Sequence, residues 1–361
     1  MKAPARASFP VNELRRGTSA LRPVPNKEDQ MENDLIIRHH SGEDGPPGSL
    51  SGFVFGRKPK TILKRSSIMI AAAVALYFGG LGTALQRIDA NPDFSPTTVE
   101  NGSHAVDMVA SLIEREVDTY RWAPNDPAFY PTAFHDNMGN FQRGVMRAVS
   151  RFTLELETQI GRLNGTSAID RDLEQAAGLL QFPTDVWLFD FQQSILPVQP
   201  ADTQYRAAAD ALRAYNARLA AGQAAFETRP DALVLTLERM LGELGARAAV
   251  IEQHTQQDSG LMDGVSDDIF YFNKGLSYAT YLLVRELGRD FDRVISTMGI
   301  EAVWAQTLDS LRQAATQRPL VVLNSSGESS IFANHLHLQG FFMKRALLQL
   351  DEVVRVLRNT R

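Results

Sequence analysis

The chain has 361 residues, enough for one large domain or two ordinary ones, and its hydrophobic fraction of 44% excludes a polytopic transporter. It contains no cysteine, which excludes disulfides, zinc–thiolate sites, iron–sulfur clusters and thiol nucleophiles. Residues 1–65 carry 12 Lys/Arg and 7 Asp/Glu, whereas residues 86–361 carry 25 and 35. The large C-terminal part is therefore acidic, which argues against binding of nucleic acid.

The first 65 residues form a basic tail rich in proline, glycine and serine, as in GEDGPPGSLSG at 42–52. The tail has too few apolar side chains to bury a core, so we expect residues 1–65 to be disordered. Its one mildly apolar island, Asn33–His40, could be a docking motif, but an incidental island in a tail is the better interpretation.

An uncharged run, IMIAAAVALYFGGLGTAL, extends from Ile68 to Leu85 and predicts a transmembrane helix at 66–86. As a helix it spans roughly 27 Å, close to the hydrocarbon thickness of a bilayer. A buried helix of a soluble domain is disfavoured by the charged flanks. A cleaved signal peptide is disfavoured because about 65 residues precede the run and no small-residue cleavage motif follows it. We therefore expect an uncleaved single-pass anchor.

Basic residues are concentrated on the N-terminal side of this segment, where Arg57, Lys58, Lys60, Lys64 and Arg65 occur. The C-terminal side carries Arg87 and then mostly acidic residues. The positive-inside rule therefore places the tail in the cytoplasm and the large C-terminal part on the far side of the membrane.

Small residues recur every four positions along the predicted transmembrane helix, at Ala71, Ala75, Gly79 and Thr83. Such a face lets two helix backbones approach closely, which would support a homodimer. The alternative, which we favour, is that alanine and glycine are simply common in transmembrane helices.

Residues 87–100, including NPDFSPTT at 91–98, are expected to be a linker, and residues 101–361 a helical domain. Apolar residues recur there with a period near 3.6 rather than 2, which predicts an all-α, helical-bundle-like fold. Five stripes carry this pattern: Val106, Val109, Leu112, Ile113 and Val117; Phe141, Val145, Val149, Phe152, Leu156, Ile160 and Leu163; Leu233, Leu237, Met240, Leu241, Leu244 and Ile251; Ile269, Phe272, Leu276, Leu283, Leu287, Phe291, Val294 and Met298; Leu338, Phe341, Leu348, Val353 and Leu357. Only Leu320–Leu323 resembles a strand.

No GxxxxGK, GxSxG, HExxH, SxxK or EF-hand pattern is present, which lowers the expectation of a common hydrolase or nucleotide enzyme. His335 and His337 invite a metal interpretation, but on a helix they would point about 200° apart and could not share one ion. In an extended segment they could, with His135 and Asp136 completing the site. We favour two histidines that hydrogen-bond locally near a helix start, and we expect no metal and no cofactor.

Three arginines, Arg143, Arg147 and Arg151, are spaced by four on a predicted helix, where like charges are mildly destabilising. They could bind a phospholipid headgroup, a glycan or an acidic partner. A solvated face, with partners supplied by other helices, is the favoured alternative.

Three segments combine aromatic residues with Asn, Asp, His or Lys near probable helix starts: Trp122–Gln142, Asp267–Tyr281 and Asn334–Arg345. Polar residues at helix starts are often caps, but they could instead converge in one groove. If so, Asn137, Lys274 and His337 should lie near one another and be partly exposed. The candidate binding residues in these segments are Trp122, Asn125, Asp126, His135, Asp136, Asn137, Asn273, Lys274, His335 and His337.

RWAPNDPAFYPTAFHDNMGNFQRGVMRAVSRF, DDIFYFNKGLSYATYLLVREL and NHLHLQGFFMKRALL resemble the DUF2333-like family of uncharacterised proteobacterial single-pass membrane proteins. The resemblance covers roughly residues 65–358. It implies a short tail, one N-terminal transmembrane helix and a helical body, and it brings no activity, cofactor or catalytic residue.

These observations together lead us to expect an inner-membrane-anchored periplasmic domain that acts by binding, as an interaction or scaffold protein of the cell envelope. An enzyme is disfavoured. The first alternative is an envelope hydrolase built from His135, Asp136, His335 and His337, and the second is a ligand-sensing domain that signals to a partner helix. The expected partners are the lipid bilayer, a second copy through the transmembrane helix, and an unidentified envelope protein or glycan.

Overall fold

A computed structural model describes residues 59–163, 170–189, 196–256, 264–318 and 335–359. Within these ranges the chain is mostly helical and contains no strand, which confirms the all-α prediction. The strand-like Leu320–Leu323 and the tail up to residue 58 lie outside the described residues.

The first helix is α1 (Pro59–Ala75), which continues through a π-helical stretch, η1 (Leu76–Leu81), into α2 (Gly82–Leu85). Its portion Leu63–Leu85, with a mean hydropathy of 2.0, is long and apolar enough to cross a membrane. The helix begins at Pro59, seven residues before the expected start at residue 66. The side chains of Ala71, Ala75, Gly79 and Thr83 are exposed on this helix.

The expected linker, residues 87–100, is packed onto the helical domain rather than extended away from it. Ala90 is buried, and Asn91 O accepts a hydrogen bond of 2.8 Å from Tyr278 Oη. Arg285 donates to Pro92 O at 2.7 Å and to Phe94 O at 2.6 Å. These bonds fix the path of the chain between the apolar helix and the domain.

The domain begins with α3 (His104–Glu114), which the side chain of Ser103 caps by accepting from Val106 N at 3.2 Å. A second π-helical stretch, η2 (Arg115–Thr119), follows directly. After a long loop come α4 (Asn137–Leu163), α5 (Arg171–Leu179) and α6 (Ala201–Ala220). The remaining helices are α7 (Pro230–Thr255), α8 (Gly264–Asp290), α9 (Asp292–Met298), α10 (Glu301–Thr316) and α11 (His335–Asn359).

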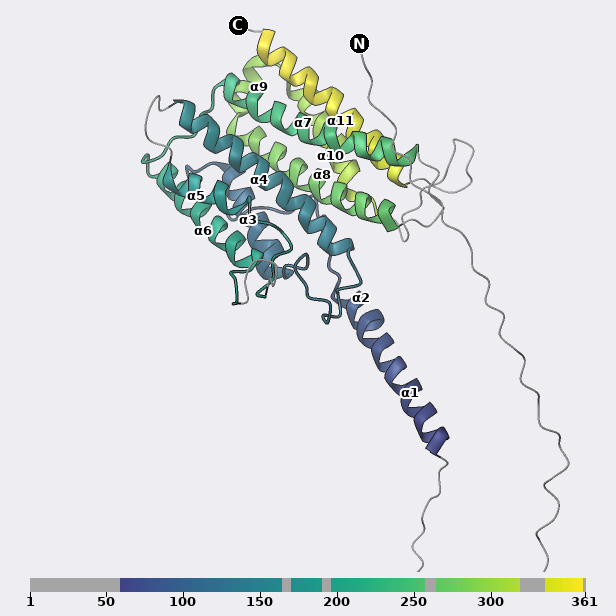
Figure 1. The fold of residues 1–361 in the computed structure, drawn as a ribbon. Helices are drawn as coiled ribbons and strands as arrows, with labels where there is room; N and C mark the ends of the chain where they lie inside the picture. The colour runs from purple at the N-terminus through teal and green to yellow at the C-terminus, as the bar shows by residue number, and fades with distance from the viewer. Residues whose placement is uncertain (1–58, 164–169, 190–195, 257–263, 319–334, 360–361) are drawn as a thin grey trace, which may run out of the picture. The chain divides into compact units, whose positions relative to one another are not determined.

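Helix α8 lies at the centre of the packing, against α4, α10, α3, α7 and α11 (Figure 1). It crosses α4 at two glycines whose faces meet backbone to backbone. A Cβ atom on Gly144 would lie 2.0 Å from Phe272 O, and one on Gly275 would lie 2.0 Å from Phe141 O. Only glycine permits this approach, which fixes the relative position of α4 and α8.

Four of the five predicted apolar stripes lie mainly in the core, but the stripe in α11 is only partly right. Leu338, Phe341 and Leu348 are exposed, whereas Val353 and Leu357 are buried as expected. The face that packs against α7 and α10 is the neighbouring one, which includes Leu336, Gly340, Met343, Ala346 and Leu350.

Candidate functional site

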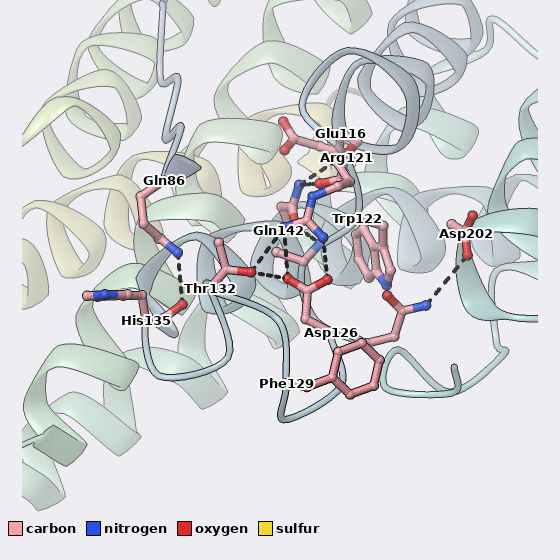
Figure 2. Close-up of polar contacts among 12 residues, drawn as sticks. Gln86, Glu116, Arg121, Trp122, Asp126, Phe129, Thr132, His135, Gln142 and Asp202 are labelled. Carbon is pink, nitrogen blue, oxygen red and sulfur yellow. Dashed lines mark hydrogen bonds and ion pairs between the residues drawn. The ribbon is translucent and has the colours of Figure 1, made fainter. Parts of the chain in front are cut away.

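The loop from Tyr120 to Asp136, which contains most of the first polar–aromatic segment, Trp122–Gln142, is held together by Asp126 (Figure 2). The Asp126 carboxylate accepts hydrogen bonds from both Nη atoms of Arg121 and from the Thr132 hydroxyl. Arg121 has a backbone φ of 67° and stacks over the Tyr130 ring at 4.9 Å. Asp126 is therefore fully engaged in stabilising this loop and is not available as a ligand-binding group.

Trp122 and Asn125 fasten the same loop to residues more than 60 positions later. Trp122 Nε1 donates to Thr184 O at 2.9 Å, and Asn125 Nδ2 donates to Val186 O at 3.1 Å. Both side chains are buried, and the Trp122 ring packs edge-on against Tyr205 at 5.0 Å. Both side chains therefore hold the loop against the segment that contains Thr184 and Val186.

His135 connects the loop to the end of the apolar helix. Its Nε2 lies 2.8 Å from Phe78 O and donates to it. Gln86, just after α2, donates to His135 O at 2.9 Å (Figure 2). It also accepts at 2.9 Å from the backbone N–H of Met138, in the first turn of α4. The helix end and the start of α4 are thus clamped together.

Three carboxylates gather where α4 and α8 begin: Asp136, Asp267 and Asp268. Burial, together with the negative charge of Asp136, raises the pKa of Asp267 and of Asp268 to about 6 each. Asn137 hydrogen-bonds Asp267, and Asn140 Nδ2 donates to Asp268 at 2.7 Å. These bonds bring the first and second polar–aromatic segments into contact.

The second and third segments also meet, since Gln339 Nε2 donates to Phe270 O at 3.1 Å. However, Asn273 and Lys274 are buried in the domain. The Lys274 ammonium donates to Gln317 O at 2.6 Å, and burial lowers its pKa to about 8. The expectation that Lys274 is partly exposed in a shared groove with Asn137 and His337 is therefore wrong.

His335 and His337 are both on α11, where residues two apart point in different directions. His337 is exposed, and His335 is half-buried with its pKa lowered by burial. In the described part of the chain, no group of three or more His, Asp or Glu side chains has the arrangement to hold a metal ion. The helical placement of the pair disfavours the His135–Asp136–His335–His337 site.

An open groove of about 540 Å³, which we call the arginine groove, lies on the described part of the domain. Helices α4 and α7 form its two sides, Leu180–Thr184 form a wall, and Tyr205 and Phe272 complete the apolar floor. The side chains from the two long helices are Arg143, Met146, Arg147 and Ser150 from α4, and Glu243, Ala246, Arg247 and Val250 from α7.

Of the three predicted arginines at intervals of four, only two line the arginine groove. Arg143 and Arg147 line the groove, whereas Arg151 lies a turn further along and faces Glu243 at 3.5 Å. Arg147 Nε donates to the same glutamate at 2.8 Å. Arg143 donates to Asn140 Oδ1 at 3.1 Å and to Pro124 O at 3.2 Å, which are uncharged acceptors.

Arg247 is the groove residue that the sequence pattern did not identify. Its guanidinium lies over the Phe272 ring at 4.1 Å, and its Nε donates to Asn273 Oδ1 at 3.2 Å. Burial lowers the pKa of Arg247, and the nearby Glu243 carboxylate opposes this effect. Within the described residues, neither Arg143 nor Arg247 forms an ion pair with a carboxylate.

The groove therefore combines three arginines, one glutamate and an apolar floor in a domain that is acidic overall. Guanidinium groups bind carboxylate and phosphate oxygens, often in pairs, and apolar side chains beside them suit an acyl or aromatic portion of the same ligand. The arrangement is suited to holding an amphipathic anion.

Comparison with known proteins gives one match. The sequence pattern of a bacterial family described as "Uncharacterized protein conserved in bacteria (DUF2333)" matches residues 83–263, half of the chain, which include the loop and all the groove residues except Phe272. No curated protein and no solved structure matches the chain. The chain therefore belongs to the DUF2333 family.

Proposed function

We propose that this chain is a single-pass protein of the bacterial inner membrane whose periplasmic helical domain binds an amphipathic anion in the arginine groove. The observation that carries the proposal is the placement of Arg143 and Arg247 beside an apolar floor without a direct ion pair to a carboxylate in the described structure, although Glu243 lies in the same groove. Buried or half-buried arginines otherwise recruit acidic partners from the same chain, as Arg213 does with Asp107 and Glu114.

The apolar helix Leu63–Leu85 supports the anchoring part of this proposal. The basic residues before it and the acidic domain after it support a cytoplasmic N-terminus and a periplasmic domain. Reporter fusions at the C-terminal Arg361 test the orientation, because a periplasm-active reporter should be active there and a cytoplasm-active reporter should be inactive.

Ligand binding is tested with decyl phosphate, which joins an anionic head to an apolar chain, on the full-length protein in nanodiscs of neutral phosphatidylcholine. We expect decyl phosphate to raise the unfolding temperature of the domain and inorganic phosphate to raise it much less, because only the former fills the apolar floor. Arg143→Gln and Arg247→Gln should each weaken decyl phosphate binding about tenfold or more.

Arg355→Gln is the matched control, since Arg355 is an exposed arginine on α11 whose partner is Asp351 in the preceding turn. Equal affinity of decyl phosphate for the groove variants and for the control variant would refute the proposed site. Replacing part of the phosphatidylcholine by phosphatidylglycerol in the nanodisc then distinguishes a membrane lipid from a free anion as the source of the head group.

A scaffold for another envelope protein is the second candidate function. The exposed apolar residues Leu338, Phe341 and Leu348 on α11 favour it, since they lie on one face of the helix. Crosslinking in native membranes from residues beside Phe341, compared with the same crosslinker placed in α6, tests this candidate.

A further inference from the structure

Five aromatic side chains from two loops form an exposed aromatic patch: Phe129, Tyr130, Phe134, Trp187 and Phe189. Phe129 is 61% exposed and Phe134 is 71% exposed, although both are large and apolar. Four of these rings are in continuous contact, because Phe129 lies 6.0 Å from Tyr130 and 5.7 Å from Trp187, and Trp187 lies 5.5 Å from Phe189. Phe134 belongs to the same loop as Phe129. Phe129 lies at the tip of its loop, turned away from the bonds around Asp126 (Figure 2).

The aromatic patch is joined directly to the apolar helix. The Phe134 ring packs edge-on against Phe78 at 4.8 Å, and Tyr77 Oη donates to Phe129 O at 3.1 Å. Gly82 lets the loop approach this closely, since a Cβ atom there would lie 2.3 Å from Pro131 O. The loop therefore contacts the helix at residues 77–82, before the helix ends at Leu85.

These contacts fix the depth of the patch relative to the membrane-spanning helix. Phe78 lies seven positions before Leu85 and so about 10 Å from the end of the apolar run, at 1.5 Å per residue. Because the loop covers residues 77–82 on one side, the stretch of helix that lipid alone can surround ends at about this level. Helix α1 before it, Pro59–Ala75, spans roughly 26 Å, which crosses most of the hydrocarbon layer when its basic side chains extend to the opposite head groups. The patch then lies at the boundary between lipid head groups and acyl chains. Aromatic residues are enriched at this depth because their rings tolerate both environments.

The composition of the two loops fits the same location. No charged residue occurs between Asp126 and Asp136, and none occurs from Val186 to Phe189. The nearby charge of Asp126 is neutralised within the loop by Arg121. The exposed carboxylates Asp136 and Asp185 lie at the margins of the two loops, so the stretches that carry the aromatic rings are uncharged, as contact with lipid requires.

We propose that the aromatic patch is inserted in the interfacial layer of the bilayer that the apolar helix crosses, so that the helical domain rests on the membrane surface rather than standing free of it. The occupant of the patch is lipid, because the patch is continuous with the helix that lipid surrounds. This inference rests on the anchoring part of the proposed function and is independent of ligand binding in the arginine groove.

Tryptophan fluorescence tests the proposal on the full-length protein in phosphatidylcholine vesicles that contain acyl-chain-brominated lipid as the quencher. Trp122 and Trp304 are buried at 3% and 5% exposure, so the difference between wild type and Trp187→Phe isolates the emission of Trp187. We expect brominated lipid to reduce this difference about twofold or more, since bromine quenches rings at the acyl-chain boundary. Unchanged Trp187 emission would overturn the proposal and would leave a second copy or another protein as the occupant.

The double variant Phe129→Ser, Phe134→Ser should lose most of the Trp187 quenching, because the loop then no longer favours the interface. Phe341→Ser is the matched control, as Phe341 is 58% exposed on α11 and not part of the patch. If the double variant does not fold, the wild-type quenching alone decides. Resistance to alkaline carbonate extraction checks the anchor, and decyl phosphate binding checks the arginine groove, so failure of this inference is distinguishable from failure of the proposed function.

Discussion

Gly275→Ala probes the α4–α8 crossing, on which the positions of the loop and of the arginine groove depend. The added Cβ would lie 2.0 Å from Phe141 O, whereas Cβ contacts shorter than 3.0 Å are essentially absent from proteins. The two helices must therefore separate by about 1 Å, and since the obstructing atom is backbone it cannot move as a side chain would. Overpacking of this kind costs about 3 kcal/mol, which exceeds the gain of about 1 kcal/mol in helix propensity.

The net loss of about 2 kcal/mol corresponds to a fall of roughly 5 °C in the unfolding temperature of a domain of this size. Far-UV circular dichroism of the full-length protein in detergent micelles measures it. Gly242→Ala on α7 is the matched control, because no atom lies within 4 Å of its added Cβ, and this variant should be up to about 1 kcal/mol more stable.

Gly144→Ala should behave like Gly275→Ala, since its Cβ would lie 2.0 Å from Phe272 O. The double variant should lose less than the sum of the two single losses, because helices already separated by one methyl group accommodate the other. If Gly275→Ala were as stable as wild type, the close crossing and the groove geometry built on it would be wrong.

Three further predictions concern other parts of the fold. Asp290→Ala should destabilise the domain by about 2 kcal/mol in chemical denaturation, because its half-buried carboxylate accepts from the backbone N–H groups at the start of α3 at 2.8 and 3.0 Å. The contribution of Asp268 to the free energy of unfolding should fall as pH rises from about 4 to 7, since its folded-state pKa, about 6, lies above its ordinary value. Asp268→Asn should remove this contribution, which is on the order of 1 kcal/mol after solvent screening. Gly79→Ile should weaken self-association in a membrane dimerisation assay and Leu76→Ile should not, and equal behaviour would exclude the small-residue face as a dimer contact.

The helical fold was predictable from local sequence, because each apolar stripe reports the period of one element. Which of two apolar faces is buried is not a local property, and α11 demonstrates this. Leu338, Phe341 and Leu348 share one face and Leu336 and Met343 share another, so only packing against α7 and α10 decides between them. The glycine crossing was equally unpredictable, since the sequence around Gly144 gives no sign that this residue packs beside Gly275, 131 positions later.

The candidate site was predictable only in part, for the same reason. Helical spacing identified Arg143 and Arg147, but the groove needs Arg247 from α7 and the wall Leu180–Thr184, which come from distant segments. Conversely, the residue types of Trp122 and Asp126 predicted ligand contacts, whereas their hydrogen bonds to Thr184 and Arg121 hold a loop in place. Residue type and position near a helix start do not distinguish a structural tie from a ligand contact; the location of the partner atom does.

The arginine groove and the aromatic patch share one piece of backbone, which links the two proposals physically. The groove wall ends at Thr184, and the patch resumes at Trp187, three residues later. Trp122 and Asn125 bond to the carbonyl oxygens of Thr184 and Val186, so the wall and the patch are held by the same loop. If the patch is seated in the bilayer interface, the groove is held close to that interface. An amphipathic anion could then enter the groove with its charged head first while its apolar portion remained in contact with lipid. An anionic lipid is therefore the ligand whose apolar portion would change its surroundings least on binding.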